Sequence, residues 1–441
     1  MLYGWAGTNL EIDLSRGNVE KMKGDPRLYE SYLGGRGLAS SMLWEKFPGE
    51  VSAFSPENPM IFAPGLLTGT MAPYANRTSL VTMSPVMEML TYSNMGGFWG
   101  AQLKQAGYDS LVISGKSPVP VYISIADDQV EIRDASHLWN KDTLETSQII
   151  QEELRNDNVE VLCIGQAGEN LVFAASIQET SGSSFSRAGV GAVMGDKRLK
   201  AIAVYGTKDI KIAEPSKFVE VCEEIYSRSG KISDIVAGMS RYPIPTLIQY
   251  RPGGTVGEEL GWEVGQAHED YVEKFKVRDA ACRNCFNPCR WRLSIPGEGD
   301  AVTKCEGYHE FINACKVKDF EFNTRCCLLC FRYGLDIIST AYTVAYMIDL
   351  YEKGLLTEED VDGIQLRYGD PDLVLLLIEK IARKEGIGAL FATGSYEAAR
   401  QIGKDAEKHL YHVKKLECFD VWNPCDGQRK VVPYCGFAVG L

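Results

Sequence analysis

The chain has 441 residues, of which 45% are hydrophobic and 24% are charged, and its formal net charge is −13. This length and composition are ordinary for a globular protein of two or three domains with a substantial core. Because surfaces that bind nucleic acid are basic, the acidic balance excludes nucleic acid as the expected partner.

The cysteine content indicates the redox compartment. The chain contains 13 cysteines, and residues 1–7 lack the basic start and apolar run of a signal peptide. We therefore predict a cytoplasmic protein whose thiols are reduced and available to metals. The longest apolar run, residues 373–378, is too short to cross a bilayer, so we predict no transmembrane segment.

Up to about residue 206 the chain has the pattern of short strands separated by Gly and Pro. The predicted strands show either period-two alternation or a continuous apolar run. They are residues 9–14, 59–63, 110–114, 119–125, 129–132 and 201–205. Residues 143–154 instead have helical apolar spacing and predict an amphipathic helix that packs on a sheet.

Beyond residues 206–216 helical periodicity dominates the sequence. Helices are predicted over residues 218–228, 340–353, 371–384 and 387–402. We therefore predict an α+β protein in which a β-rich part is followed by an α-helical part. The predicted domains are residues 1–208, residues 209–417, and residues 418–441 as the start of a truncated third domain.

Cys282, Cys285 and Cys289 form a C-x2-C-x3-C motif that contains Asn and Pro turn formers. A short loop of this kind brings three thiolates to one metal centre and is typical of an iron–sulfur site. A four-iron cluster needs a fourth ligand, which must come from elsewhere. The alternative is a zinc knuckle, but Cys327 and Cys330 lie too far downstream for zinc-ribbon spacing.

Glycine-rich turns in the first half of the chain predict contact with an anionic group. Residues 94–100 offer backbone N–H groups that no side chain obstructs. Residues 186–195 offer the same together with the guanidinium of Arg187, and Arg77 could clamp a phosphate bidentately. Ordinary tight turns use the same residue types. The third glycine, Gly195, comes one place too late for a dinucleotide fingerprint.

The order of five segments resembles that of the aldehyde ferredoxin oxidoreductase family. These segments are the one around Arg77, residues 95–99, residues 186–195, the cysteine loop and residues 333–336. The resemblance covers essentially the whole chain and is greatest to the tungsten subunit of class II benzoyl-CoA reductase. It implies an N-terminal two-sheet, pterin-binding domain followed by an α-helical domain. It also implies a tungsten bis-pyranopterin, with molybdenum as the alternative metal and magnesium bridging the pterin phosphates, beside a 4Fe–4S cluster.

The resemblance assigns roles residue by residue. The cluster would be held by Cys282, Cys285 and Cys289. The expected pterin-binding residues are Arg77, Asn94, Gly96, Gly97, Arg187, Ala188, Gly189, Leu335 and Asp336.

Residues 304–310 carry the expected metal thiolate and the expected proton carriers. Cys305 lies where the benzoyl-CoA reductase type provides a cysteine to tungsten. Glu310, preceded by His309, aligns with the acid–base glutamate of the aldehyde-oxidising type. The alternative for Cys305 is a buried thiol without a metal, and the alternative for His309 and Glu310 is a solvated helix edge.

The sequence departs from the family pattern at two places. Phe331 and Arg332 occupy the stretch where the family has an acidic residue. The chain also stops near the expected start of a C-terminal domain that carries the fourth cluster cysteine. Either the chain is a fragment, or another polypeptide completes the site, or Cys425 or Cys435 is the ligand.

Three functions follow from the resemblance. The first is a tungsten–pterin oxidoreductase subunit that transfers low-potential electrons to an aromatic acyl-CoA. The second is an aldehyde:ferredoxin oxidoreductase, and the third is a non-catalytic electron-transfer or structural subunit. All three imply an anaerobic, oligomeric protein that exchanges electrons with an iron–sulfur subunit or ferredoxin, and the first two imply a small-molecule or acyl-CoA substrate.

Overall fold

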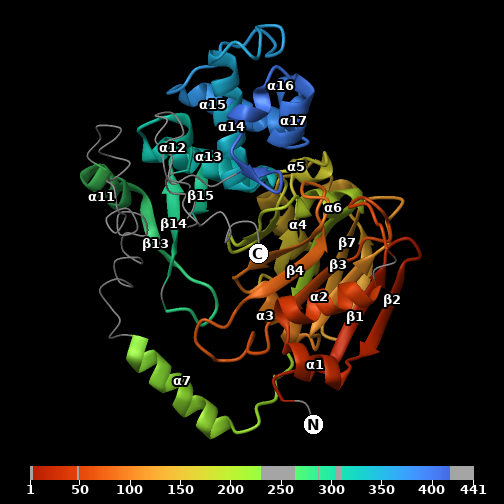
Figure 1. The fold of residues 1–441 in the computed structure, drawn as a ribbon. Helices are drawn as coiled ribbons and strands as arrows, with labels where there is room; N and C mark the ends of the chain where they lie inside the picture. The colour runs from red at the N-terminus through yellow and green to blue at the C-terminus, as the bar shows by residue number, and fades with distance from the viewer. Residues whose placement is uncertain (1–2, 47–48, 230–263, 287, 304–309, 418–441) are drawn as a thin grey trace.

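The computed structural model describes residues 3–46, 49–229, 264–286, 288–303 and 310–417. A β-rich unit forms the first half of the chain, and a helical unit lies above it (Figure 1). The α+β architecture with two N-terminal sheets is therefore confirmed, while the exact domain boundaries stay predictions. Among the described residues, no helix is long and apolar enough to span a membrane.

The first sheet of the β-rich unit has the strand order β2-β1-β6-β3-β4-β5. Its only parallel pair, among the strands described, is β1 with β6, in which Leu10 is opposite Leu111. Because side chains alternate along each strand with period two, one face of this sheet points into the protein core. The strands are β1 (Thr8–Asp13), β2 (Asn18–Lys23), β3 (Met60–Pro64), β4 (Thr78–Met83), β5 (Leu90–Met95) and β6 (Ser110–Ser114).

The second sheet has the order β11-β10-β9-β12-β7-β8, with β12 parallel to β7. Buried side chains of both sheets, such as Phe62, Ile123 and Ile202, form one core between them. The strands are β7 (Val121–Ala126), β8 (Gln129–Asp134), β9 (Glu160–Cys163), β10 (Ile177–Glu179), β11 (Ser184–Phe185) and β12 (Leu199–Tyr205).

Helices cover the outer faces of both sheets. Leu38 and Leu43 of α2 pack on the first sheet, and Ile150 of α4 packs on the second. Helix α4 begins at a capping box between Asp142 and Glu145, so its predicted bounds are confirmed. The helices of this unit are α1 (Pro26–Tyr32), α2 (Gly35–Lys46), α3 (Trp99–Gln105), η1 (Ser136–Leu138), α4 (Thr143–Leu154), α5 (Gln166–Glu169) and α6 (Val190–Asp196).

A small three-stranded sheet that the sequence did not predict carries the cysteine loop. It has the antiparallel order β13-β14-β15, and the loop joins β13 to β14. Buried Trp291 and Leu293 of β14 pack against Phe320 of the helical unit. The elements of this region are α7 (Pro215–Ser229), α11 (Val264–Phe275), β13 (Lys276–Ala280), β14 (Arg290–Ile295) and β15 (Gly299–Thr303).

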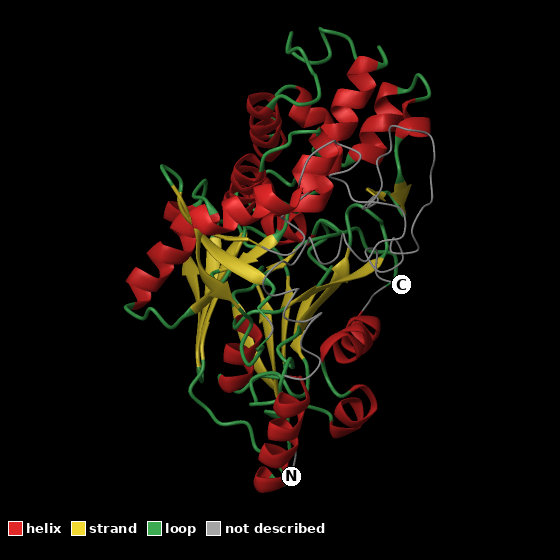
Figure 2. Cartoon of the chain, turned by 90° about the vertical axis from the view of Figure 1, so that its left-hand side faces the viewer, coloured by secondary structure: helices red, strands yellow, loops and turns green. Residues whose placement is uncertain are grey.

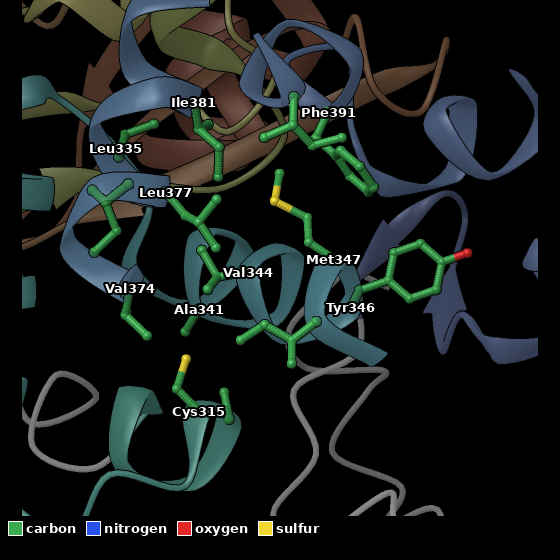
Figure 3. Packing of buried hydrophobic residues seen from close by; sticks show 14 of the residues in the cluster. Cys315, Leu335, Ala341, Val344, Tyr346, Met347, Val374, Leu377, Ile381 and Phe391 are labelled. Carbon is green, nitrogen blue, oxygen red and sulfur yellow. The ribbon is translucent and has the colours of Figure 1, made fainter. Parts of the chain in front are cut away.

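The helical unit has its own apolar core, in which Val344 and Met347 of α14 lie against Leu377 of α15 (Figure 3). Figure 2 shows these helices stacked at one end of the two sheets. The elements are α12 (Glu310–Cys315), α13 (Phe320–Tyr333), α14 (Ile337–Glu352), α15 (Pro371–Arg383), α16 (Ile387–Phe391), α17 (Ser395–Ile402), η3 (Ala406–His409), β16 (His412–Val413) and β17 (Leu416–Glu417).

The single helix predicted over residues 387–402 is wrong. The chain forms two helices there, and Gly394 between them has φ 89° and ψ 153°. This conformation is available essentially only to glycine, and it turns the chain before α17. The other predicted helices, over residues 218–228, 340–353 and 371–384, are confirmed within a few residues as α7, α14 and α15.

Candidate functional site

A cavity of about 560 Å³ lies where the β-rich unit, the cysteine loop and the start of α14 meet. Its wall contains Cys282, Cys285 and Cys289 from the loop. Arg77 and Arg187 of the β-rich unit line the same cavity. The glycine- and arginine-containing turns of the first half and the thiols of the second half therefore face one shared space.

The cysteine loop is held on the β-rich unit by asparagine side chains that donate to main-chain carbonyls and by one aromatic contact. Asn76 donates its side-chain N–H to the Arg283 carbonyl at 2.5 Å, and Asn284 donates to the Thr70 carbonyl at 2.6 Å. The Asn284 backbone has φ 53°, a left-handed conformation that asparagine tolerates. Phe286, two residues further on, packs against Tyr74 with ring centroids 4.4 Å apart. These contacts fix the position of the thiols relative to the turns.

Cys282, Cys285 and Cys289 form no disulfide and are partly buried. Within the described part of the chain, no three His, Cys, Asp or Glu side chains surround one point closely enough to hold a single ion. The thiols instead line a larger space. Such an arrangement suits a cluster, because its cysteine ligands bind different irons.

Gly96 makes room for the first thiol of the loop. A Cβ atom added at Gly96 would lie 2.6 Å from the Cys282 sulfur. Cβ atoms essentially never approach another heavy atom so closely, so a side chain here would displace the thiol. The glycine turn and the cysteine loop therefore depend on each other for their close approach.

Arg187 offers hydrogen-bond donors to the cavity. Its Nη2 donates to the Glu417 carbonyl at 2.7 Å. Its Nε and Nη1 are buried and have no hydrogen-bond partner among the described residues. Buried guanidinium donors without partners are costly, so this side chain suits a bound anion that would accept from them.

The N-terminus of α14 also lies at the cavity. Asp336 caps the helix by accepting from the Ser339 N–H at 2.8 Å, and Ile337 and Ile338 line the cavity wall. The positive end of the helix dipole and the N–H groups of the first turn favour anions.

The charge around the cavity contrasts with that of the whole chain. Arg283 and Arg290 join Arg77 and Arg187 in the wall, so four arginines face one aspartate, Asp336. The chain as a whole has a net charge of −13. A cavity this rich in guanidinium groups fits a polyanionic occupant, which the phosphates of a bis-pyranopterin beside a thiolate-bound cluster would be.

The structure brings some of the predicted pterin-binding residues together and leaves others aside. Asn94, Gly96 and Asp336 line the cavity together with Arg77 and Arg187. The others lie within two residues of a lining residue in sequence but are not part of the wall. They are Gly97, Ala188, Gly189 and Leu335. Gly97 packs on Glu179 and Gly189 on Pro85, while Ala188 is buried and Leu335 is buried in the helical core.

The predicted proton carriers and metal thiolate are only partly within the described residues. Glu310 is fully buried at the start of α12 and is not part of the cavity wall. Cys305 and His309 lie outside the described residues. The catalytic roles of Glu310 and His309 and the metal role of Cys305 stay predictions.

Sequence reasoning missed the acidic residue that shapes the glycine turn. Buried Glu179 accepts from the N–H groups of Phe98 and Trp99, both at 2.6 Å, and its carboxylate fills the space beside Gly97. Burial and the Glu179 charge raise the pKa of Glu160 to about 8. No local pattern marks Glu179, because its partners are about 80 residues away in sequence.

Sequence reasoning also left Arg283 and Arg290 without a role, although both lie in or beside the cysteine motif. The available signal was a positive side chain adjacent to each of two candidate thiolates, Cys282 and Cys289. Guanidinium groups beside thiolates would stabilise their negative charge.

Two sheets followed by a helical unit, with thiols and arginines around one cavity at their junction, define an oxidoreductase built around redox-active groups. Sequence models of the aldehyde ferredoxin oxidoreductase family agree. The model of the N-terminal domain matches residues 9–206, and the model of domains 2 and 3 matches residues 256–425. The chain belongs to the aldehyde ferredoxin oxidoreductase family.

Similar proteins include the tungsten-containing aldehyde ferredoxin oxidoreductase of Pyrococcus furiosus. It is 36% identical over 425 residues, which cover 94% of this chain and 70% of the relative. The aliphatic sulfonate oxidoreductase WOR-like subunit of the same organism is 29% identical, covering 94% of this chain and 71% of the relative.

Among solved structures, the active site complex BamBC of benzoyl coenzyme A reductase with 1,5-dienoyl-CoA contains a similar chain. The TM-score is 0.84 at 39% identity, covering 95% of this chain and 66% of that chain. The present chain thus spans about two thirds of the length of its relatives.

Proposed function

We propose that this chain is a tungsten–pterin, iron–sulfur oxidoreductase subunit that passes low-potential electrons to an aromatic acyl-CoA. The observation that carries the proposal is the cavity in which four arginines and three thiols face one space. The likeness to the benzoyl coenzyme A reductase complex, whose structure contains a dienoyl-CoA, supports the acyl-CoA class.

The residues of this chain would divide the work between two groups. Arg187 and Arg77, with the N-terminus of α14, would hold the pterin phosphates, and magnesium could share their oxygens. Cys282, Cys285 and Cys289 would hold a 4Fe–4S cluster. When bound, the tungsten pterin would supply two-electron redox chemistry, and the cluster would carry single electrons. Gly96 keeps the two binding regions in close approach.

We also propose which residues supply protons. Glu310 is fully buried, so a proton on its carboxyl would be shielded from solvent. We propose that Glu310 and His309 hold the protons that accompany the electrons, and that Cys305 is a metal thiolate. An iron–sulfur subunit or ferredoxin would exchange electrons with the cluster, and the working protein would be an oligomer.

A second candidate is the oxidation of aldehydes with electrons leaving to ferredoxin. The relatives at 36% and 37% identity are named aldehyde ferredoxin oxidoreductases. The two reactions run in opposite directions. The first adds two electrons and two protons to an acyl-CoA, whereas the second converts an aldehyde and water to a carboxylic acid with release of two electrons and two protons.

The test begins with elemental analysis of protein purified without oxygen, for tungsten, molybdenum and iron. Loaded protein is then assayed with a reduced low-potential dye and benzoyl-CoA, and separately with simple aldehydes and an oxidised dye. We expect tungsten and iron to be bound and the acyl-CoA to be reduced. Aldehyde turnover alone would establish the second candidate. Iron without tungsten, and inactivity in both assays, would identify a non-catalytic electron-transfer or structural subunit.

A further inference from the structure

We propose that Arg290 positions the Cys282 thiolate and raises the reduction potential of the cluster held by the loop. The inference rests on the proposed function only in requiring that the loop holds an iron–sulfur cluster. Arg290 is therefore a positioning residue that acts through Cys282.

The guanidinium of Arg290 lies beside the sulfur. Its Nη2 donates to Cys282 Sγ at 3.6 Å, a normal length for a hydrogen bond to sulfur. Its Nη1 donates to the Ser181 carbonyl at 2.9 Å and to Ser183 Oγ at 2.8 Å. Because the guanidinium is planar, the contacts on Nη1 fix the direction of Nη2. Only 4% of Arg290 is exposed, so water screens this contact little.

The partners of Arg290 are themselves held in place. Ser181 donates its hydroxyl to Glu179, whose carboxylate accepts from the N–H groups of Phe98 and Trp99 in the glycine turn. That turn contains Gly96, against which Cys282 Sγ is packed. The sulfur therefore lies against the glycine and within hydrogen-bonding distance of the arginine, and one buried acidic residue, Glu179, supports both.

The electrostatic effect has a definite sign. Reduction adds one electron to a cluster that already carries the charge of its thiolates, so a nearby cation stabilises the reduced form. Hydrogen bonds to ligand sulfur act in the same direction. Arg290 supplies both effects to Cys282, and its removal should lower the reduction potential.

The experiment compares three variants of the full chain, purified without oxygen. Arg290→Gln removes the charge, and Arg290→Lys keeps the charge but loses the planar fork. Arg292→Gln is the matched control, because it removes the same charge two residues along β14 from a half-exposed side chain paired with Asp300 at 3.0 Å. Each variant is measured for iron and labile sulfide, for thermal unfolding, and for the cluster midpoint by potentiometry followed by electron paramagnetic resonance.

We expect Arg290→Gln to keep its iron and to have a lower midpoint. At the wild-type midpoint, the ratio of reduced to oxidised cluster should fall roughly tenfold, a shift of about 59 mV for one electron. Arg290→Lys should have a smaller shift with an altered resonance signal, and Arg292→Gln should match the wild type.

Other outcomes also decide the matter. Loss of iron from both Arg290 variants at an unchanged melting temperature supports the proposal, because Cys282 would then have lost its support. A wild-type midpoint and signal in iron-loaded Arg290→Gln overturns it, as does loss of iron together with the fold in both Arg290 variants. A wild-type protein that binds no iron refutes the proposed function itself and is seen before any variant is compared.

Discussion

The close approach of Gly96 and Cys282 can be tested by adding one methyl group. In Gly96→Ala the new Cβ would lie 2.6 Å from Cys282 Sγ, while the next nearest atoms are 3.8 Å away, an ordinary contact distance. The sulfur is therefore the single obstacle. Overpacking of this kind costs about 1–3 kcal/mol. In a unit of ~200 residues each kcal/mol lowers the melting temperature by about 2–4 °C.

The assay is thermal unfolding of the metal-free, reduced protein, so no bound group contributes. Cys282→Ala removes the obstructing sulfur, and the double variant should recover most of the stability lost in Gly96→Ala. The double-mutant cycle of Gly96→Ala and Cys282→Ala should give a favourable coupling free energy of about 1–2 kcal/mol. Gly37→Ala in α2 is the comparison: its Cβ would lie 3.3 Å from the Tyr32 carbonyl oxygen, a tight contact but not a clash, so its cost should be smaller than that of Gly96→Ala. If the two substitutions were simply additive, the contact argued from the structure would be refuted.

Three further predictions concern stability. Glu160, whose folded pKa is raised from 4.5 to about 8, keeps its proton in the folded state, so it destabilises the protein progressively as pH rises from 4.5 to 8. Glu160→Gln should raise the free energy of unfolding at pH 8 by roughly 1–3 kcal/mol, after allowing for the partial exposure of this side chain, and should hardly change it at pH 4.5; thermal unfolding at the two pH values measures the difference. Asp336→Ala should cost about 1 kcal/mol through the lost α14 cap, whereas Asp336→Asn should cost little, as calorimetry would show. Gly394→Ala should cost roughly 1–3 kcal/mol by the same measurement, because its φ of 89° strains any side chain.

Local patterns predicted the elements that local physics determines. Helix α4 has its cap, its amphipathic face and its end within one stretch of sequence, and its predicted bounds are exact. The two helices over residues 387–402 were predicted as one, because apolar spacing continues across Gly394 and only the backbone conformation divides them. The sheet β13–β15 was missed because its strands are short and its register is set by antiparallel pairing between segments.

The candidate site was predictable where a residue type has one dominant use. Cysteine spacing, glycine-rich turns and isolated arginines identified Cys282, Gly96 and Arg187, and the structure places all three around one cavity. Glu179 and Arg290 could not be assigned in this way. Their roles depend on contacts 80 and 109 residues apart in sequence, which no spacing rule contains.

Arg187 shows what the cavity costs the folded chain. Two buried donors of Arg187 have no partner among the described residues, and each such donor costs about 1–3 kcal/mol. The third nitrogen, Nη2, donates to the Glu417 carbonyl, and this hydrogen bond restrains the orientation of the guanidinium. The folded chain therefore has buried positive donors without acceptors among the described residues. An anion that entered the cavity would accept from them without a rearrangement of the Arg187 side chain. Hydrogen-bond donors that are already oriented before the ligand binds are expected of a site that binds an anionic redox group tightly and in one orientation.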